Sequence, residues 1–266
     1  MNKIVFLLLV LFGFGCGSNA TSPSAALPES PVPTPSPESA PAPAAESEWE
    51  PTSDQVAPPP PPPPPAVSPP DPAQHAKDYA QLRQWIKGRR SELQRAGEES
   101  ASRLGAEMSR ILIDSIFPYW RGTPWDFNGH TAVPRQGEIA CGYFVSTTIR
   151  HLGIGINRYK VAQQAAADII HLLCDTTSIQ EFRSLDQLRA KLEERENYEL
   201  LIVGLDFHVG FLYKKEDVLY FAHSNYLDRK GVEVERFDDS PALRQSNLYV
   251  LGSFSRNADM IRQWTP

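Results

Sequence analysis

A single cysteine and a distant histidine carry the clearest chemical signal in this chain. Cys141 opens an apolar stretch with helical spacing, and His208 opens the run His-Val-Gly-Phe-Leu-Tyr, which favours a strand. At a helix N-terminus, free N–H groups and the helix dipole favour a thiolate over a thiol. A histidine on a rigid strand can be held beside that sulfur as the proton acceptor. Cys141 and His208 are therefore predicted to be a nucleophile and its general base.

A third polar residue is expected to orient the base. His223 and Asn225 lie two positions apart in an expected strand, so their side chains face the same way. Either side chain can accept a hydrogen bond from His208 and fix the tautomer of its ring. The spacing of the residues leaves both candidates open.

Other chemistry finds little support in the sequence. There is no Cys-x-x-Cys pair, no His-Glu-x-x-His and no glycine-rich phosphate loop. His130, His151 and His171 do not have the spacing of metal ligands. The net charge of −6 argues against a nucleic acid as partner. We expect neither a metal nor a cofactor.

The secondary structure expected to position these residues changes from helices to strands along the chain. Residues 74–116 have a helical apolar pattern, which Gly97 interrupts and Pro118 is expected to end. Further helices are expected over 141–152, 159–173 and 184–196, with Gly153 closing the first and Ser184 capping the last. Strands are expected over 200–205, 209–213, 218–222, 232–236 and 248–254. Helices followed by a run of antiparallel strands predict an α+β fold.

The N-terminus has the pattern of an export signal. Lys3 precedes an apolar run from Ile4 to Phe14, which is shorter than the roughly 20 residues that a membrane-spanning helix needs. Cys16 follows this run and a glycine, which resembles a bacterial lipobox. Acyl chains on Cys16 would anchor the exported protein to a membrane of the bacterial cell envelope, periplasmic side or outer membrane.

A proline-rich segment separates this signal from the rest of the chain. Twenty of the 25 prolines lie between Pro23 and Pro72, eight of them consecutive. Such a composition buries too little apolar surface to fold and predicts an extended tether. The expected division is a signal peptide (1–15), a disordered linker (16–72), a helical arm (73–117), a catalytic domain (118–256) and a C-terminal tail (257–266).

Several of these residues resemble a known family. The stretch Trp120-Arg-Gly-Thr-Pro-Trp125 and the later Cys141-Gly-Tyr-Phe are similar to the catalytic segment of NlpC-type cell-wall cysteine peptidases. His208-Val-Gly resembles that family's His-Val-Gly strand, and Phe221-Ala-His-Ser-Asn225 resembles its next strand. The likeness covers about residues 119–225. These peptidases are small papain-like enzymes that cut peptidoglycan stem peptides.

The resemblance implies a papain-like fold in which N-terminal helices pack on an antiparallel sheet. It implies a peptidoglycan or peptide substrate, and it favours His223 over Asn225 as the third residue, because His223 matches the family position. An oxyanion needs two donors. The backbone N–H of Cys141 is one candidate, and the resemblance places either Trp125 or Gln136 as the other.

Two other interpretations stay open. A different amidase or acyltransferase chemistry would use the same scaffold. A non-catalytic envelope lipoprotein, which binds cell wall or a partner protein, would have Cys141 buried, bonded to Cys174 or distant from His208. The sequence does not indicate an oligomeric state.

Overall fold

The structure is a computed structural model that describes residues 71–98 and 100–265. The expected signal peptide, Cys16 and nearly all of the expected linker lie outside these residues. The described part is a mixed fold of helices and one antiparallel sheet, which confirms the predicted α+β class. No helix in this part has both the length and the apolar character that crossing a bilayer requires.

The described chain contains helices of very different length. They are α1 (Pro72–Arg95), α2 (Ala101–Arg110), α3 (Phe117–Trp120), α4 (Cys141–Leu152), α5 (Arg158–Ala162), α6 (Ala166–Leu173), α7 (Leu185–Glu193), α8 (Pro241–Arg244) and α9 (Ala258–Trp264). A π-helical turn, η1 (Ile111–Ile116), joins α2 to α3. The 3₁₀ turns are η2 (Thr176–Ser178), η3 (Leu227–Arg229) and η4 (Phe237–Asp239).

The sheet of the described part has six strands in the order β1-β6-β2-β3-β4-β5, and all neighbours are antiparallel. The strands are β1 (Gln180–Phe182), β2 (Leu201–Gly204), β3 (Val209–Lys215), β4 (Val218–Asn225), β5 (Gly231–Arg236) and β6 (Tyr249–Ser253). Each of the five predicted strands is present. β1 was not predicted, because three residues are too few to show an alternating pattern.

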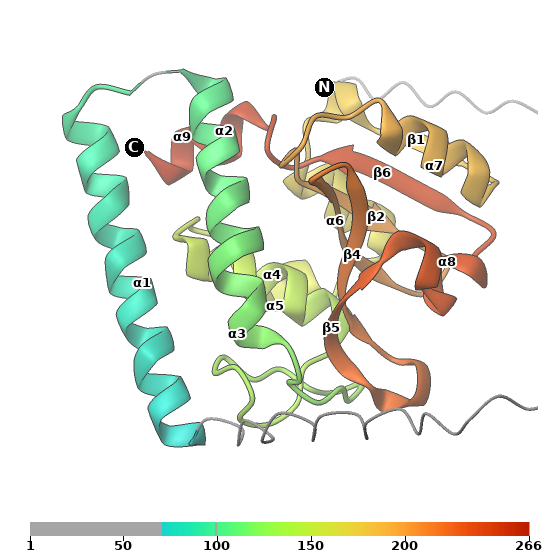
Figure 1. The fold of residues 1–266 in the computed structure, drawn as a ribbon, viewed down its shortest axis with the longest axis horizontal. Coiled ribbons are helices and arrows are strands. Elements are labelled where there is room, and N and C mark those ends of the chain that lie inside the picture. Colours follow the sequence, from blue (N-terminus) through green and yellow to red (C-terminus); the bar gives the residue numbers. More distant parts are fainter. Residues whose placement is uncertain (1–70, 99, 266) are drawn as a thin grey trace, which may run out of the picture. The chain divides into compact units, whose positions relative to one another are not determined.

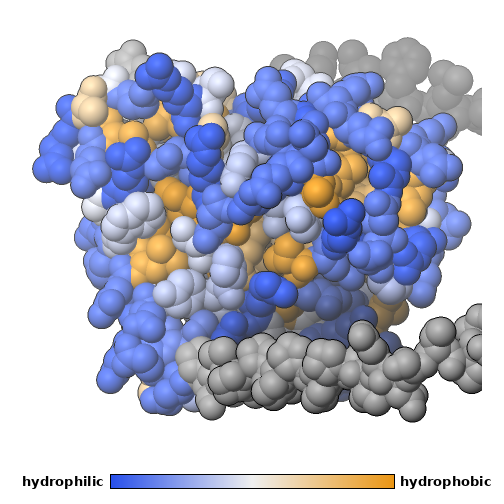
Figure 2. All heavy atoms as spheres, viewed as in Figure 1, coloured by the Kyte–Doolittle hydropathy of each residue, from blue (hydrophilic) through white to orange (hydrophobic). Residues whose placement is uncertain are grey.

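Both faces of the sheet are covered, because successive side chains of a strand point to opposite faces. One face, which includes Phe211, packs against α4 and α6. The other, which includes Leu212, packs against α7 and α8. Figure 1 shows α1 and α2 side by side, with α4 between these helices and the sheet. On the face in that view, hydrophilic side chains cover most of the surface and hydrophobic ones form separate patches (Figure 2).

The helical arm shares its core with the rest of the fold. Tyr79 of α1 is buried, and its hydroxyl accepts a hydrogen bond from Trp120 Nε1 at 2.8 Å and meets His151 Nδ1 of α4 at 2.9 Å. At its other end, Arg90 donates to the Trp264 carbonyl of α9 at 2.6 Å. Residues 257–266, expected as a tail, thus contain a helix that packs into the core.

Two predicted boundaries differ from the structure. Pro118 was expected to end the helical region, but it lies inside α3, which continues directly from the π-helical turn η1 and ends at Trp120. The helix expected over 159–173 is two helices, α5 and α6. Gly153 ends α4 as predicted, with a left-handed φ of 110°.

Candidate active site

Cys141 is the first residue of α4 and follows a loop that is tied to the sheet. Apolar residues at helical spacing, among them Phe144 and Ile149, bury the helix against the sheet and fix its direction. The Ser224 hydroxyl of β4 donates to the Ile139 carbonyl at 2.6 Å, and the Ala140 N–H donates to Gly129 at 2.8 Å. These bonds hold the start of α4 at the end of β4.

The same loop is tied to β5 at its other end. Gly122 donates to the Val232 carbonyl, and Val232 donates back to the Thr123 carbonyl, both at 2.8 Å. Gly231 permits this approach: it has a φ of 85°, and a Cβ there would lie 2.2 Å from the Thr123 oxygen. These bonds fix the backbone that leads to Trp125, which is two residues after Thr123.

His208 immediately precedes β3 and closes a tight turn after β2. The Leu205 N–H donates to the His208 carbonyl at 2.8 Å. The Asp206 carboxylate anchors the turn by accepting from the Asn247 N–H at 2.8 Å. The His208 side chain is buried, whereas Phe207 beside it is 94 % exposed.

His208 and His223 are in direct contact. Nε2 of His208 lies 2.7 Å from Nδ1 of His223, and Nε2 of His223 lies 3.1 Å from a carboxylate oxygen of Glu235 on β5. Nδ1 of His208 is buried and has no partner among the described residues. Of the two candidates for the third residue, His223 is thus the one that contacts the base; Asn225 instead donates to Glu233 and accepts from the Leu227 N–H.

The glycine of the His-Val-Gly stretch makes this contact possible. A Cβ at Gly210 would lie 2.6 Å from the Phe221 ring and 2.9 Å from the Cβ of His223. The two rings of β4 stack on each other with centroids 4.1 Å apart, and they lie over Gly210. The missing side chain gives His223 the space to reach His208.

One cavity of about 640 Å³ is lined by both Cys141 and His208. Cys141 is partly exposed. The backbone N–H groups of Val209, next to His208, and of Gly142 and Cys141 favour the charged form of the Cys141 sulfur. The structure therefore brings together the two residues that are 67 positions apart in the sequence. Five aromatic residues also line the cavity: Trp125, Phe127, Tyr143, Phe207 and Tyr226.

Burial controls the protonation of the three groups. It raises the pKa of the Cys141 thiol, although the surrounding backbone N–H groups oppose this. This differs from the lowering expected at a helix N-terminus, because loss of water around the sulfur outweighs the local dipoles. Burial lowers the pKa of His208 well below its usual value, and it lowers the pKa of His223 to about 3. At neutral pH the site holds a thiol and two neutral imidazoles.

The two candidates for the oxyanion donor differ in position. Trp125 lines the cavity, and its indole Nε1 is buried without a hydrogen-bond partner among the described residues. Gln136 does not line the cavity. Its side-chain amide donates a hydrogen bond of 3.0 Å to the Pro72 carbonyl. The geometry supports Trp125 over Gln136, whose side chain is bonded elsewhere.

Cys174 has no part in this site. It is free and buried at the end of α6, and burial raises the pKa of its thiol. Cys141 is free as well, so a bridge between these two cysteines is absent from the described residues.

His223, Glu233 and Glu235 form a group whose ligand atoms lie within 4.8 Å of one another, close enough for a metal ion. The existing bonds already use these atoms. Nε2 of His223 is paired with Glu235, and the Glu233 carboxylate is paired with the Asn225 amide.

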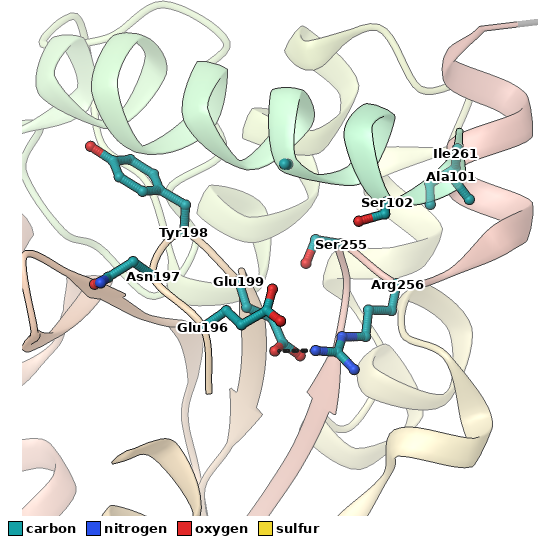
Figure 3. Close-up of a pocket in the computed structure, with 10 residues that line it drawn as sticks. Ala101, Ser102, Glu196, Asn197, Tyr198, Glu199, Ser255, Arg256 and Ile261 are labelled. Atoms are coloured by element: carbon teal, nitrogen blue, oxygen red, sulfur yellow. Dashed lines mark hydrogen bonds and ion pairs between the residues drawn. The ribbon is translucent and has the colours of Figure 1, made fainter. Parts of the chain in front are cut away.

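A second cavity is of a different kind. It lies beside α2 and α9, and Figure 3 shows Glu199 pointing toward Arg256 within it. The buried Glu199 carboxylate accepts from Arg256 at 2.9 Å and from Ser253 at 3.0 Å. These charges pair with each other, and the residues that line this cavity include no cysteine or histidine. We interpret the cluster as a structural one that joins β2 to β6.

Sequence reasoning missed Glu235, Phe127 and Phe207. Glu235 lies in a strand that was predicted, but its contact with His223 depends on the pairing of β4 with β5, which the sequence does not give. Phe207 offered a usable signal, because it is an aromatic residue in a turn directly before the proposed base.

Three comparisons complete this description of the site. No family model, no curated protein and no solved structure matches the chain.

Proposed function

We propose that the chain is an exported, lipid-anchored cysteine hydrolase that cleaves amide bonds, with peptidoglycan stem peptides as its substrate. The observation that carries this proposal is the cavity that Cys141 and His208 both line, with Nδ1 of His208 left without a partner among the described residues. The papain-like scaffold is part of the proposal and rests on the helix-borne cysteine and the strand-borne histidine. The lipid anchor rests on the position of Cys16 in the sequence.

The first step is attack by sulfur. Nδ1 of His208 is the ring nitrogen left for the thiol, because Nε2 is bonded to His223. It removes the proton from Cys141 as the sulfur bonds to the substrate carbonyl carbon. A neutral thiol and a neutral imidazole suit such a transfer, since proton movement and attack can proceed together without a resting ion pair.

The negative charge that develops on the carbonyl oxygen requires donors that are already in place. The Trp125 indole N–H and the Cys141 backbone N–H fill this role. His208 then returns its proton to the departing amine, and the carbon–nitrogen bond breaks to leave a thioester on Cys141. Water, deprotonated by His208, hydrolyses the thioester and restores the thiol.

Digestion of purified muropeptides by the full-length protein tests the proposal. We expect new amine and carboxyl termini with the wild type and none with Cys141→Ala or His208→Ala. Cys174→Ala is the matched control and should retain activity, because that thiol is buried away from the cavity. Equal product from wild type and Cys141→Ala, or none from any protein across many muropeptides, would contradict the proposal and favour a non-catalytic binding role.

A further inference from the structure

The walls of the catalytic cavity carry no formal charge. Of the described residues, those that line the cavity include no lysine, arginine, aspartate or glutamate. Its polar groups are few: Cys141, His208, Asn128 and Gln163, beside the polar edges of the aromatic rings. An ionised substrate group placed here would lose water without gaining a counter-ion, which is unfavourable.

The charged residues behind these walls are already engaged. Arg229 lies over the Trp125 ring at 5.8 Å and pairs with Asp126 at 2.8 Å. Arg158 lies 5.7 Å from the Tyr143 ring centroid and donates to the His130 carbonyl at 2.7 Å. Neither guanidinium is among the groups that line the cavity.

Two phenylalanines at this cavity are strongly exposed. Phe207 is 94 % exposed and Phe127 is 78 % exposed, and both line the cavity from different loops. The turn that holds Phe207 is anchored through Asp206, so the ring is held in water by a fixed backbone. Apolar surface exposed in this way at a site is typical of a binding surface.

We infer that the substrate group beside the scissile carbonyl is uncharged and apolar, and that Phe207 and Phe127 bind it. This inference rests on the proposed function and narrows it. Among stem-peptide bonds, it selects those flanked by alanine over those flanked by acidic or diamino residues. It equally admits an amide that carries an aliphatic or aromatic acyl group.

Alkylation of Cys141 in the full-length protein tests the inference without requiring turnover. The probes are iodoacetamide, N-benzyl iodoacetamide and iodoacetate, with rates read by peptide mass spectrometry and divided by the rates for free cysteine. We expect the benzyl reagent to be favoured about tenfold over iodoacetamide, which is the size of effect that burying one ring gives. Iodoacetate should be disfavoured by about the same factor.

Variants assign this preference to the two rings. Phe207→Ala and Phe127→Ala should each reduce the ratio of the benzyl rate to the iodoacetamide rate. Trp85→Ala is the matched control, because Trp85 is 52 % exposed on α1 and does not line the cavity. Equal normalised rates for all three probes, or a preference for iodoacetate, overturn the inference while leaving the nucleophile intact. A Cys141 that reacts with none of the probes overturns the proposed function as well.

A separate observation concerns Glu235, whose side chain is 14 % exposed. A carboxylate only accepts hydrogen bonds, so the bond to Glu235 keeps the His223 proton on Nε2. Nδ1 of His223 must then accept from Nε2–H of His208. Nδ1 of His208 is then unprotonated, with a lone pair that no described residue uses. In this series of hydrogen bonds from Glu235 to His208, the position of each proton is set by the preceding bond.

The geometry points to Glu235 as a positioning residue that sets the tautomer of His208 through His223. Without the carboxylate, His223 can carry its proton on Nδ1 and donate to His208. Nδ1 of His208 would then be protonated and unable to accept the thiol proton. Glu235 touches neither the substrate nor the sulfur, so its effect is exerted entirely through the two rings.

Nitrogen-15 NMR of histidine-labelled protein reads the tautomers directly. In the wild type we expect His208 and His223 both protonated at Nε2. Glu235→Ala should give mixed tautomers and slow the alkylation of Cys141 by iodoacetamide about tenfold at neutral pH. Glu235→Gln should lose less, since an amide oxygen can still accept. Glu181→Gln, on β1 at the other edge of the sheet, is the control and should keep the wild-type tautomers.

Two results would overturn this role. One is an unchanged tautomer in Glu235→Ala with a lower melting temperature, which indicates packing alone. The other is a tautomer in the wild type that changes on adding EDTA, which indicates that a metal ion holds Nε2 of His223. Neither result bears on whether Cys141 is the nucleophile.

Discussion

The indole N–H of Trp125 is buried and has no hydrogen-bond acceptor among the described residues. A buried donor without a partner is rare in folded proteins because it costs desolvation energy. In the proposed mechanism this cost is offset when an oxyanion forms beside the indole. We expect Trp125→Phe, which keeps a ring but removes the donor, to lower kcat/KM on muropeptides about 100-fold with little change in KM. Steady-state kinetics measure this, and a large loss of thermal stability would indicate a packing role instead.

The two cysteines of the described chain differ in access and in their neighbours. Cys141 is partly exposed beside His208, whereas Cys174 is 2 % exposed, and burial raises the pKa of its thiol. At pH 7.5 we expect iodoacetamide to modify Cys141 and to spare Cys174 until the protein is unfolded in denaturant. His208→Ala should slow the reaction of Cys141, because the raised pKa of this thiol makes it depend on a neighbouring base. Peptide-resolved mass spectrometry separates the two sites, and equal reaction of both would contradict their placement.

At the scale of elements, β3 and β4 create the contact between the two histidines. A Cβ at Gly210 would meet both the Phe221 ring and His223, at 2.6 and 2.9 Å. We expect Gly210→Ala to displace His223 from His208, to abolish most of the activity, and to cost about 1–3 kcal/mol of unfolding free energy. Gly155→Ala is the control, since a Cβ there meets nothing within 4 Å. Chemical denaturation and muropeptide digestion give the two readouts; full activity in Gly210→Ala would refute this role of the glycine.

Secondary-structure elements that are determined by neighbouring residues can be predicted from the sequence. The strands that carry His208 and His223 have apolar runs between turn residues, and Gly153 marks the end of α4 because few other residues adopt its φ of 110°. The position of Cys141 at a helix start follows from the same local pattern. These predictions concern neighbours in the chain, where spacing alone determines the outcome.

Contacts between elements that are far apart in the sequence could not be predicted. The bond from His223 to Glu235 requires the register of β4 on β5, and the preference for Trp125 over Gln136 follows from the bond of Gln136 to the Pro72 carbonyl. The direction of the Cys141 pKa was also predicted wrongly, because helix dipoles can be inferred from sequence whereas the loss of solvent cannot. Strand register and burial are both properties of the assembled fold.

At the scale of the whole described molecule, the arm and the sheet form one core. Buried Tyr79 and Trp120 connect to His151, and His151 lies in the same helix as Cys141. Arg83, Arg150 and Arg158 also act on this imidazole, and together with burial they lower its pKa to about 3. The position of α4, and with it Cys141, therefore depends on a histidine that must stay neutral.

Acid should destabilise the protein for this reason. Below pH 6.5 the unfolded chain protonates His151, His208 and His223, whereas the native protein does not until far lower pH. Unfolding then takes up protons, so the free energy of unfolding falls as the pH falls. Between pH 6.5 and 5.0 the loss is about 2 kcal/mol for each histidine. Above pH 7 these groups are neutral in both states and contribute no slope.

His151→Gln separates this effect from acid sensitivity of the site itself. Glutamine supplies an oxygen that can accept from the Tyr79 hydroxyl but does not titrate. We expect melting temperatures of the wild type to be constant from pH 8 to 7 and to fall steadily below 6.5, with about one third of that slope missing in the variant. His171→Gln, at an exposed position of α6, should keep the wild-type slope. Identical slopes in wild type and His151→Gln would mean that the junction of α1 with α4 admits a charged imidazole, and that the arm is held to the nucleophile's helix more loosely than its buried bonds indicate.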